Sequence, residues 1–515
     1  MAETQSNTFP VVSVGPNLTE ISQLPSIMAS ARAGFDKFSK MPLDERLELI
    51  RQLRYKIVER QDEIADVIAT STGKIKTEAL TTEVMIVVDA ILHVEKRAAK
   101  ALGTRRIKTP ITFIGKQSFL EYKPRGVVAV ISTWNFPFML SMVPAVEALA
   151  AGNAVIIKPS EETPPVGMLI ESLFREMDLP SGVANVVHGG PDLGEALLKA
   201  KPDFVHFTGS EKVGRKVAAI TGPELIPTIL ELGGKDPMIV FEDANIERAV
   251  NGAIWGAFSN AGQVCMAVER VYVHRSIYDT FVDLLVREVE KLRVGDDNSD
   301  DIGLMTLNEQ VNIVKRHVKE ALDHGAKLLT GDHPDNWAEG TLKLRPMVLT
   351  NVKQDMSVMQ EETFGPVLPI MPFDTEEQAV ELANDSRYGL NSSVWTADLS
   401  RGRRVISSLQ TGGALINDVI LTIGNPYLPY GGVKNSGVGA YHADQGMQSF
   451  AIQTAIMVDR GRKVREAHWF PYLGKGDLFG DLLESYWSSS RNLATFGLSY
   501  LKLRLSSRGK GSAES

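Results

Sequence analysis

Cysteine is nearly absent from this chain, which has one such residue, Cys265, among 515. A single cysteine excludes an internal disulfide and any metal site built from several thiolates, and it fits a reducing compartment. The thiol is therefore either a buried side chain without a chemical role or a nucleophile. Residue type alone favours burial. The neighbours Asn260, Gly262 and Gln263 favour a turn, in which backbone N–H groups can lower the pKa of a thiol.

Long apolar runs and an excess of basic residues are also lacking. No uninterrupted apolar stretch reaches the roughly 18–20 residues of a membrane span, and the polar N-terminus does not resemble a secretory signal. A net charge of −8 argues against nucleic-acid binding. His206 and His442 have no metal-ligand spacing to a partner, so we predict structural roles for both and no metal site. These absences predict a soluble, cytoplasmic protein.

What the chain does have is length and a regular alternation of patterns. Its 515 residues predict more than one domain, and helical spacing at 43–61 and 78–102 predicts surface helices. Strands are then expected at 127–132, 154–158, 184–188, 204–208 and 228–232, with helices at 165–177, 193–200 and 211–221 between them. This alternation is typical of a doubly wound parallel sheet, which binds ligands at the carboxyl ends of its strands.

The second half of the chain continues the alternation. It has predicted strands at 237–241, 270–274, 389–396 and 413–417, apolar segments at 345–350 and 366–372, and predicted helices at 246–260, 277–292, 309–325 and 376–384. We therefore expect a second α/β domain that begins near Gly233.

Polar side chains lie at several predicted strand ends and turns, where such a fold places its sites. They are Asn135, Lys158, Glu231, the turn Phe207–Gly214 and the pair Glu361 and Glu362. Loop capping is the favoured role for Asn135, and solvent exposure is favoured for Lys158 and the carboxylate pair. Function is slightly favoured for Glu231, because burying a carboxylate costs several kcal/mol unless it is paired or protonated. The glycine turn suits a phosphate at a helix N-terminus, although a plain strand–turn–helix explains it equally well.

Taken together and in this order, these segments resemble the aldehyde dehydrogenase superfamily. The likeness covers roughly residues 25–460, and the glutamate and cysteine motifs, at residues 231 and 265, have the family's order and its separation of 34 positions. The matching segments are Trp134–Pro137, Ala151–Asn153, Lys158–Glu161, Phe207–Gly214, Glu231–Lys235, Gly262–Cys265 and Glu362–Pro366.

The resemblance implies a catalytic role for three residues. Cys265 would attack the aldehyde carbon, and the side-chain amide of Asn135, with the backbone N–H of Cys265, would form the oxyanion hole of the thiohemiacetal. After hydride transfer leaves a thioester, Glu231 would activate the water that hydrolyses it.

The resemblance also implies a dinucleotide site. Lys158 and Glu161 would hold the adenosine ribose, Gly209, Ser210 and Gly214 would face the diphosphate, and Glu362 and Phe364 would hold the nicotinamide end. Ile131, Trp134 and Leu232 complete the predicted site. NAD is favoured over NADP, because the Glu161 carboxylate would repel a 2′-phosphate.

Two segments resemble the branch of the family that acts on fatty and aromatic aldehydes. They are Tyr430–His442 and the position of Pro144. A hydrophobic aldehyde, aliphatic or aromatic, is therefore the expected substrate. The alternatives are a semialdehyde dehydrogenase, an acylating enzyme that passes the thioester to coenzyme A, and a non-catalytic scaffold with the same fold.

The expected organisation has four parts. Residues 1–112 and 126–232 form the NAD-binding domain, 233–445 the catalytic domain, and 113–125 with 446–460 a small β arm for assembly into a homodimer or homotetramer. Residues 461–515 form an amphipathic tail. The tail either docks on a neighbouring subunit or, through residues 477–510, contacts the surface of an intracellular membrane.

Overall fold

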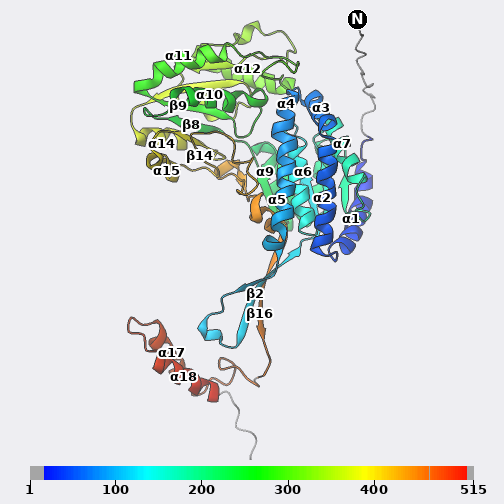
Figure 1. The fold of residues 1–515 in the computed structure, drawn as a ribbon, viewed down its shortest axis with the longest axis vertical. Helices are drawn as coiled ribbons and strands as arrows, with labels where there is room; N and C mark the ends of the chain where they lie inside the picture. The colour runs from blue at the N-terminus through cyan, green and yellow to red at the C-terminus, as the bar shows by residue number, and fades with distance from the viewer. Residues whose placement is uncertain (1–16, 463, 507–515) are drawn as a thin grey trace, which may run out of the picture. The chain divides into compact units, whose positions relative to one another are not determined.

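The computed structural model describes residues 17–462 and 464–506. The chain forms two compact units, residues 1–103 with 122–454 and residues 104–121 with 455–515. The first unit contains two large sheets, each with helices packed against it (Figure 1).

The first sheet has six strands in the order β15-β7-β6-β3-β4-β5, and only β15 is antiparallel to its neighbour. Its strands are β3 (Val127–Ile131), β4 (Ala154–Lys158), β5 (Ala184–Val186), β6 (Phe204–Thr208), β7 (Thr228–Glu231) and β15 (Gly437–Val438). The β-branched runs of β3 and β4 are buried along their whole length, as expected of strands covered on both faces.

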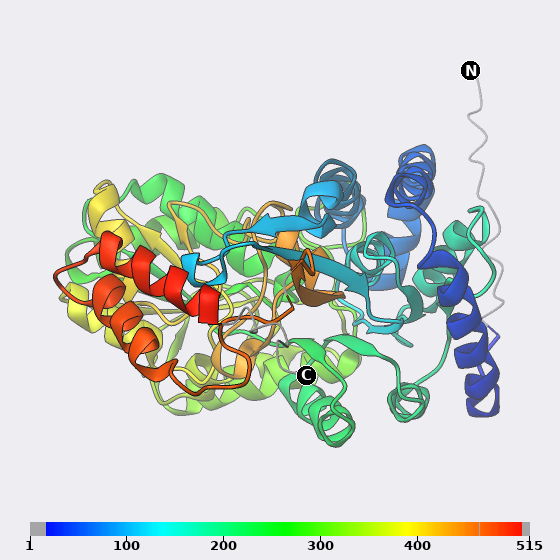
Figure 2. The same cartoon turned by 90° about the horizontal axis from the view of Figure 1, so that it is seen from below.

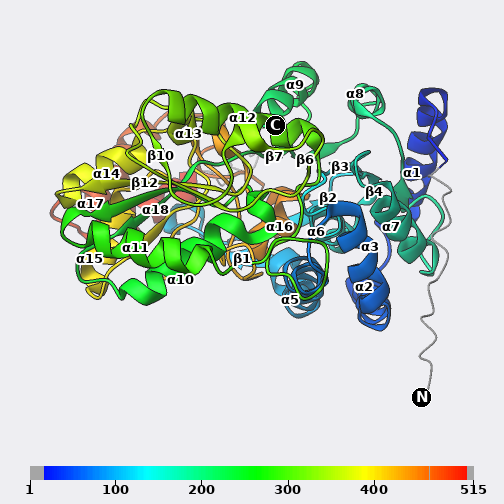
Figure 3. The ribbon, with the colours of Figure 1, turned by 90° about the horizontal axis from the view of Figure 1, so that it is seen from above.

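Alternate residues of β3 enter two different cores. Val128 and Val130 pack with the core that includes α6, whereas Val127, Ala129 and Ile131 pack with α1 and α8. Figure 3 shows α8 and α9 on one side of these strands and α2, α5 and α6 on the other. The sheet is therefore doubly wound, as predicted.

Register aligns the carboxyl ends of the parallel strands in one row. Ile131 pairs with Lys158 on one side and Phe207 on the other, and Thr208 pairs with Glu231. Strand order reverses between β3 and β6, and in such sheets this is where ligands bind.

The second sheet has seven strands in the order β10-β11-β12-β9-β8-β13-β14, parallel except for β10. They are β8 (Asp236–Val240), β9 (Val268–His274), β10 (Lys327–Leu328), β11 (Met347–Thr350), β12 (Val367–Phe373), β13 (Ser393–Trp395) and β14 (Leu415–Ile416).

Helices precede, separate and cover these strands. Those of the first part are α1 (Leu24–Phe38), α2 (Leu43–Glu59), α3 (Gln61–Thr72), α4 (Lys76–Ala79), α5 (Met85–Leu102), α6 (Met139–Ala150), α7 (Pro164–Arg175), α8 (Pro191–Lys199) and α9 (Glu211–Thr221). Those that follow are α10 (Ile246–Phe258), α11 (Tyr278–Val289), α12 (Asn308–Asp323), α13 (Ser357–Gln360), α14 (Glu376–Asn384), α15 (Leu399–Ser408) and α16 (Ala443–Ser449).

The second unit contains most of a three-stranded sheet and a helical hairpin. The sheet has the order β1-β2-β16, with β1 (Arg105–Ile107), β2 (Lys116–Pro124) and β16 (Ala451–Asp459). Helices α17 (Gly476–Trp487) and α18 (Leu493–Ser506) lie side by side (Figure 2), around a small core of Leu482, Phe496 and Leu503. No helix within the described residues is long and apolar enough to cross a membrane.

The predicted fold class, α/β with a doubly wound parallel sheet and a second α/β part, is confirmed. Three details differ from expectation. The helix expected at 78–102 is interrupted by a π-helical turn at Leu80–Val84, and the strand expected at 389–396 is only β13, because Gly389 bonds to Gly412 and Val433 instead of a strand. The β arm also includes β1, which precedes residue 113.

Candidate active site

Asn135 lies in the loop between β3 and α6, at the carboxyl edge of the first sheet. The residue is only 2% exposed, and its Nδ2 donates to the carbonyl oxygen of Gln263 at 3.0 Å. Its Oδ1 has no hydrogen-bond partner among the described residues. The side chain thus joins its own loop to the loop that carries Cys265, instead of only capping the loop in which it lies.

The segment before Cys265 is a tight turn with left-handed backbone. Asn260, Ala261 and Gly262 have φ values of 50°, 53° and 74°. A Cβ at Gly262 would lie 2.2 Å from the carbonyl oxygen of Gly365, so only glycine fits there. Positive φ at Asn260 and Ala261 is strained, and such strain persists only where surrounding contacts fix the backbone.

Cys265 is half-buried, and its Sγ lies 3.4 Å from the hydroxyl of Tyr430. Burial raises the pKa of this thiol to about 12; the Tyr430 hydrogen bond opposes the shift, and the charges of Glu362, Asp236 and Glu231 add to it. This corrects the expectation that the turn lowers the pKa, because burial disfavours the thiolate and the nearby charged groups are carboxylates instead of cations. The resting thiol is protonated at neutral pH and needs a base to become a nucleophile.

Glu231 is the last residue of β7 and is 3% exposed. Neither carboxyl oxygen has a hydrogen-bond partner among the described residues, and burial raises the pKa of the group well above its ordinary value. Buried polar groups nearly always have a partner, so a carboxyl group of this kind is expected to bind water or a ligand. When it is ionised, Glu231 also raises the pKa of the Cys265 thiol.

Two glycines after β7 allow close approach by other segments. A Cβ at Gly233 would lie 2.3 Å from the Glu362 carboxylate, and one at Gly234 would lie 2.4 Å from the carbonyl oxygen of Cys265. The N–H of Gly234 donates to Glu362 at 3.1 Å. Burial, with the charge of Glu269, raises the pKa of Glu362 to about 8. Glu362 is therefore a packed carboxyl group near Cys265, whereas its residue type had favoured a solvated loop.

The turn after Glu362 is fixed by a buried ion pair. Glu269 accepts the N–H groups of Thr363 and Phe364, each at 2.8 Å, and pairs with Lys235. Phe364, with φ at 52°, meets the Trp134 ring edge to face, with ring centroids 5.5 Å apart. Trp134 and Phe364, both predicted for the cofactor site, thus lie together.

Lys158 and Glu161 form an ion pair of 2.8 Å at the end of β4, beside Ile131 at the end of β3. β4 lies three strands from β7. At roughly 4.8 Å per strand, the pair is about 14 Å from Glu231 along the sheet. The predicted ribose-binding pair is therefore separate from Cys265 and Glu231. An extended dinucleotide requires such a separation between the site of its adenosine end and the site of its nicotinamide end.

The glycine turn after β6 leads into α9. Ser210 caps this helix by accepting the N–H of Val213 at 3.4 Å. A Cβ at Gly214 would lie 2.5 Å from the Leu232 side chain, and one at Gly209 would meet the Phe207 ring at 2.6 Å. A helix N-terminus that begins beside small residues at the ligand edge suits a diphosphate.

The groups along this sheet edge fit a nicotinamide dinucleotide. A lysine–carboxylate pair for a ribose, a helix N-terminus for phosphates and a further carboxylate beside two aromatic rings lie along one sheet edge. Across residues 17–462 and 464–506, no group of three or more His, Cys, Asp or Glu side chains is arranged to hold a metal. His206 and His442 are buried, and burial lowers the pKa of each to about 3.

A cavity of about 300 Å³ has Cys265 in its wall. Most of the wall is apolar, two carboxylates contribute to it, and none of its lining residues is basic. The apolar residues are Met85, Ile86, Phe136, Met139, Leu140, Trp255, Val264, Met266, Ile420, Leu421 and Ile423, and the acidic residues are Glu78 and Asp89.

Some contacts of the site could not be predicted from the sequence, although Tyr430 and Lys235 lie in segments that carry the resemblance. Tyr430, which bonds to Cys265, lies 165 positions away from it. Lys235 and Glu269, which hold the turn of Phe364, are separated by 34 positions and lie in different strands or loops. Only contacts between distant segments bring these groups together.

Comparison with known proteins gives consistent matches. The profile of the aldehyde dehydrogenase family matches residues 15–456. A 4,4′-diapolycopene aldehyde oxidase from a Methylomonas species is 43% identical, covering 85% of this chain and 82% of that protein. A putative NADP⁺ succinate-semialdehyde dehydrogenase from Mycolicibacterium smegmatis is 34% identical, covering 88% and 89%. The structure of an NAD-dependent aldehyde dehydrogenase from Sinorhizobium meliloti superposes with a TM-score of 0.83 at 32% identity, covering 88% and 90%.

Proposed function

Because the chain belongs to the aldehyde dehydrogenase family, we propose that it oxidises a hydrophobic aldehyde to the carboxylic acid with NAD. The observation that carries the proposal is the apolar cavity with Cys265 in its wall. An apolar chain would be buried there, and burial contributes about 25 cal/mol per Å² of apolar surface.

In this proposal, Cys265, Glu231 and Asn135 perform the chemistry. The Cys265 sulfur adds to the aldehyde carbon, and the thiol proton passes to solvent. The oxyanion faces the Asn135 amide and the Cys265 N–H, and losing one such donor typically costs ~3 kcal/mol of transition-state stabilisation. The chemistry supplied by a bound dinucleotide is hydride acceptance, which turns the thiohemiacetal into a thioester. Glu231 then activates the hydrolytic water.

The cavity wall favours a neutral aldehyde over a semialdehyde. The matched relatives include a diapolycopene aldehyde oxidase and a putative succinate-semialdehyde dehydrogenase, so their names leave both substrate classes open. A semialdehyde carries a carboxylate at the end away from its aldehyde, and this charge would meet Glu78 and Asp89 and no basic lining residue. An unpaired buried charge is costly, and this supports an apolar tail. Glu231 supports hydrolysis rather than transfer to coenzyme A, and with Cys265 and Asn135 argues against a non-catalytic scaffold.

NAD is proposed over NADP because of Glu161. This carboxylate already pairs with Lys158, so the lysine charge is compensated before a 2′-phosphate could use it. The likeness to both NAD- and NADP-named proteins leaves the choice to experiment.

The test measures NADH and NADPH formation with hexanal, decanal, benzaldehyde and 4-oxobutanoate. We expect kcat/KM to be highest for decanal or benzaldehyde with NAD and lowest for 4-oxobutanoate. Cys265→Ala should give no measurable turnover with any of them. Preference for 4-oxobutanoate would contradict the proposed substrate class, and unchanged turnover by Cys265→Ala would contradict the mechanism.

We also propose that the protein is cytoplasmic, assembles as a homodimer or homotetramer through its β arm, and contacts membranes through its tail. Residues 460–510 contain ten lysines and arginines against four acidic side chains, in a chain whose net charge is −8. Apolar side chains of the second unit are exposed, among them Phe470 at 73%, Leu473 at 94% and Trp487 at 53%. Basic residues with exposed aromatic rings suit an anionic lipid surface.

A further inference from the structure

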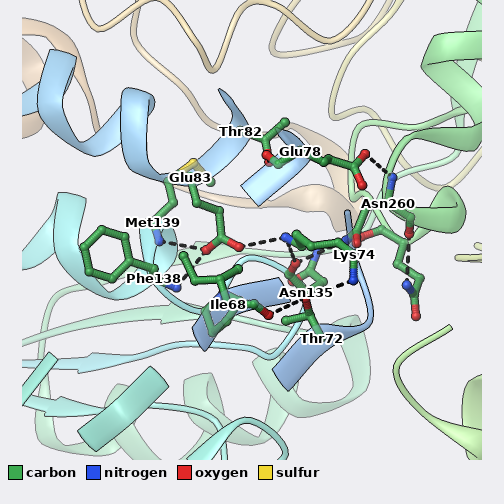
Figure 4. Close-up of polar contacts among 12 residues, drawn as sticks. Ile68, Thr72, Lys74, Glu78, Thr82, Glu83, Asn135, Phe138, Met139 and Asn260 are labelled. Carbon is green, nitrogen blue, oxygen red and sulfur yellow. Dashed lines mark hydrogen bonds and ion pairs between the residues drawn. The ribbon is translucent and has the colours of Figure 1, made fainter. Parts of the chain in front are cut away.

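A buried ion pair lies directly behind the Asn135 loop (Figure 4). Lys74, between α3 and α4, has a fully buried side chain. Its Nζ donates to the Glu83 carboxylate at 2.7 Å and to the backbone carbonyl oxygen of Asn135 at 2.8 Å. Buried ion pairs are costly to desolvate, and well-packed apolar residues often stabilise a fold equally well or better. Stability alone is thus a weak reason for this pair.

Glu83 extends the same network to the start of α6. Its second oxygen accepts the N–H groups of Phe138 and Met139, at 2.8 and 3.2 Å. A carboxylate at a helix N-terminus is favoured by the helix dipole and by the free N–H groups there. The Lys74–Glu83 pair therefore holds both the middle of the Asn135 loop and the helix into which it leads.

The carbonyl oxygen of Asn135 has a second donor from the nucleophile turn. Asn260 Nδ2 donates to it at 3.1 Å, and the backbone N–H of Asn260 in turn donates to Glu78. Figure 4 shows Lys74 and Asn260 reaching Asn135 from different segments. Two donors on this one carbonyl fix the peptide plane that follows Asn135. They thereby also fix the Asn135 Cα, from which the side chain extends.

We propose that Lys74 is a positioning residue that sets the Asn135 amide for the oxyanion. The inference rests on the proposed function, because the position matters only if the Asn135 amide stabilises that charge. Oxyanion donors act within about 2.7–3.1 Å of the developing charge, and a displacement of about 1 Å can reduce a rate on the order of a hundredfold.

Two paired variants isolate the hydrogen bond from the charges. The methionine form is Lys74→Met/Glu83→Gln, and the glutamine form is Lys74→Gln/Glu83→Gln. Both remove the ion pair without leaving a buried charge, but only the glutamine form retains an N–H donor at position 74 for the carbonyl oxygen of Asn135. We expect kcat for decanal on the order of tenfold lower in the methionine form than in the glutamine form, with KM within about twofold. Lys76→Met, in the same segment, removes a partly exposed pair with Asp66 and serves as the control.

Repeating the comparison with Asn135→Ala distinguishes positioning from a structural role. If Lys74 acts through Asn135, the difference between the methionine and glutamine forms disappears in that background. Equal kcat values in the two forms, or a difference that persists with Asn135→Ala, would overturn the inference. If the methionine form does not fold, Lys74→Arg is the test variant. It retains the positive charge and an N–H donor at position 74, so its kcat should be close to that of the wild type, and a much lower kcat in a folded protein would overturn the inference. An inactive wild-type protein would instead refute the proposed function.

Discussion

The Cys265 thiol is surrounded by groups that oppose its ionisation. Burial raises its pKa to about 12, while only the Tyr430 hydroxyl bonds to it. Burial also raises the pKa of Glu231, so burial disfavours the ionised form of both groups in the resting site. A thiol of this kind is protected from adventitious oxidation until a substrate and a base are in place.

The pH dependence of alkylation tests this thiol directly. Cys265 is the only cysteine, so iodoacetamide incorporation reports one group. Because the thiolate is the reactive form and the raised pKa is about 12, the rate constant of the folded protein should rise about tenfold per pH unit from pH 7 to 10 without a plateau. The protein unfolded in urea should level off near the ordinary thiol pKa of ~8.5. A plateau of the folded protein below pH 9 would contradict the account.

Some residues of the site could be proposed from the sequence and others could not. Cys265, Glu231 and Asn135 each lie at a strand end or a turn within a recognisable motif. Lys74 had no such signal, and Tyr430 only began a segment that resembles one branch of the family, because the roles of both come from contacts with segments 61 and 165 positions away. The raised thiol pKa was also missed, since it depends first on the burial of Cys265 by distant segments and then on the charges of three carboxylates.

At the scale of elements, the start of α9 depends on a glycine. The Gly214 backbone lies so close to Leu232 that a Cβ would approach its side chain to 2.5 Å. Gly214→Ala should therefore displace α9 from the sheet edge and raise KM for NAD severalfold or more, with a smaller change in KM for the aldehyde.

Gly222→Ala is the matched control for that change. It lies at the other end of α9, where an added Cβ meets no atom within 4 Å. Steady-state kinetics with NAD varied at saturating aldehyde would compare the two variants. Equal KM values for NAD in Gly214→Ala and wild type would argue against a dinucleotide site at this helix.

The α17–α18 hairpin carries the proposed membrane contact. Its small core leaves large apolar side chains exposed, including Leu483 at 61%. The full chain should co-sediment with phosphatidylserine vesicles at low salt, and part of it should be released at high salt. A chain that ends at Gly476 should not co-sediment with them. Vesicles of phosphatidylcholine alone give the control. Equal binding with and without the hairpin would exclude this contact.

Element types were more predictable than their limits. Periodicity identified the parallel strands, because β-branched runs buried on both faces stand out in a sequence. It placed a continuous helix over 78–102, but a π-helical turn interrupts it at Leu80–Val84, next to Glu83 and the Asn135 network. A strand was also expected over 389–392, but Gly389 and Leu390 bond to the loop residues Gly412 and Gly413, and only Ser392 bonds to β14, through Leu415.

For the whole molecule, the order of strands along the chain predicted the sheets but not how distant ends join them. β15, at residues 437–438, adds an antiparallel strand to the first sheet beside Glu231. Likewise β1 joins the arm with β2 and β16, from segments more than 300 positions apart. The family resemblance predicted that 113–125 and 446–460 share an arm, but the places of β1 and β15 follow from the assembled fold and not from local patterns.

In the proposed mechanism, Cys265 carries the acyl group and Glu231 activates the water that releases it. Glu231→Gln should retain the first half of the reaction and lose hydrolysis, giving one NADH per active site and then very slow turnover. Mass spectrometry of this variant after incubation with decanal and NAD measures the intermediate directly. The account predicts a decanoyl group on the peptide that contains Cys265, formed only when NAD is present. Stoichiometric NADH without an acyl group on Cys265 would contradict it.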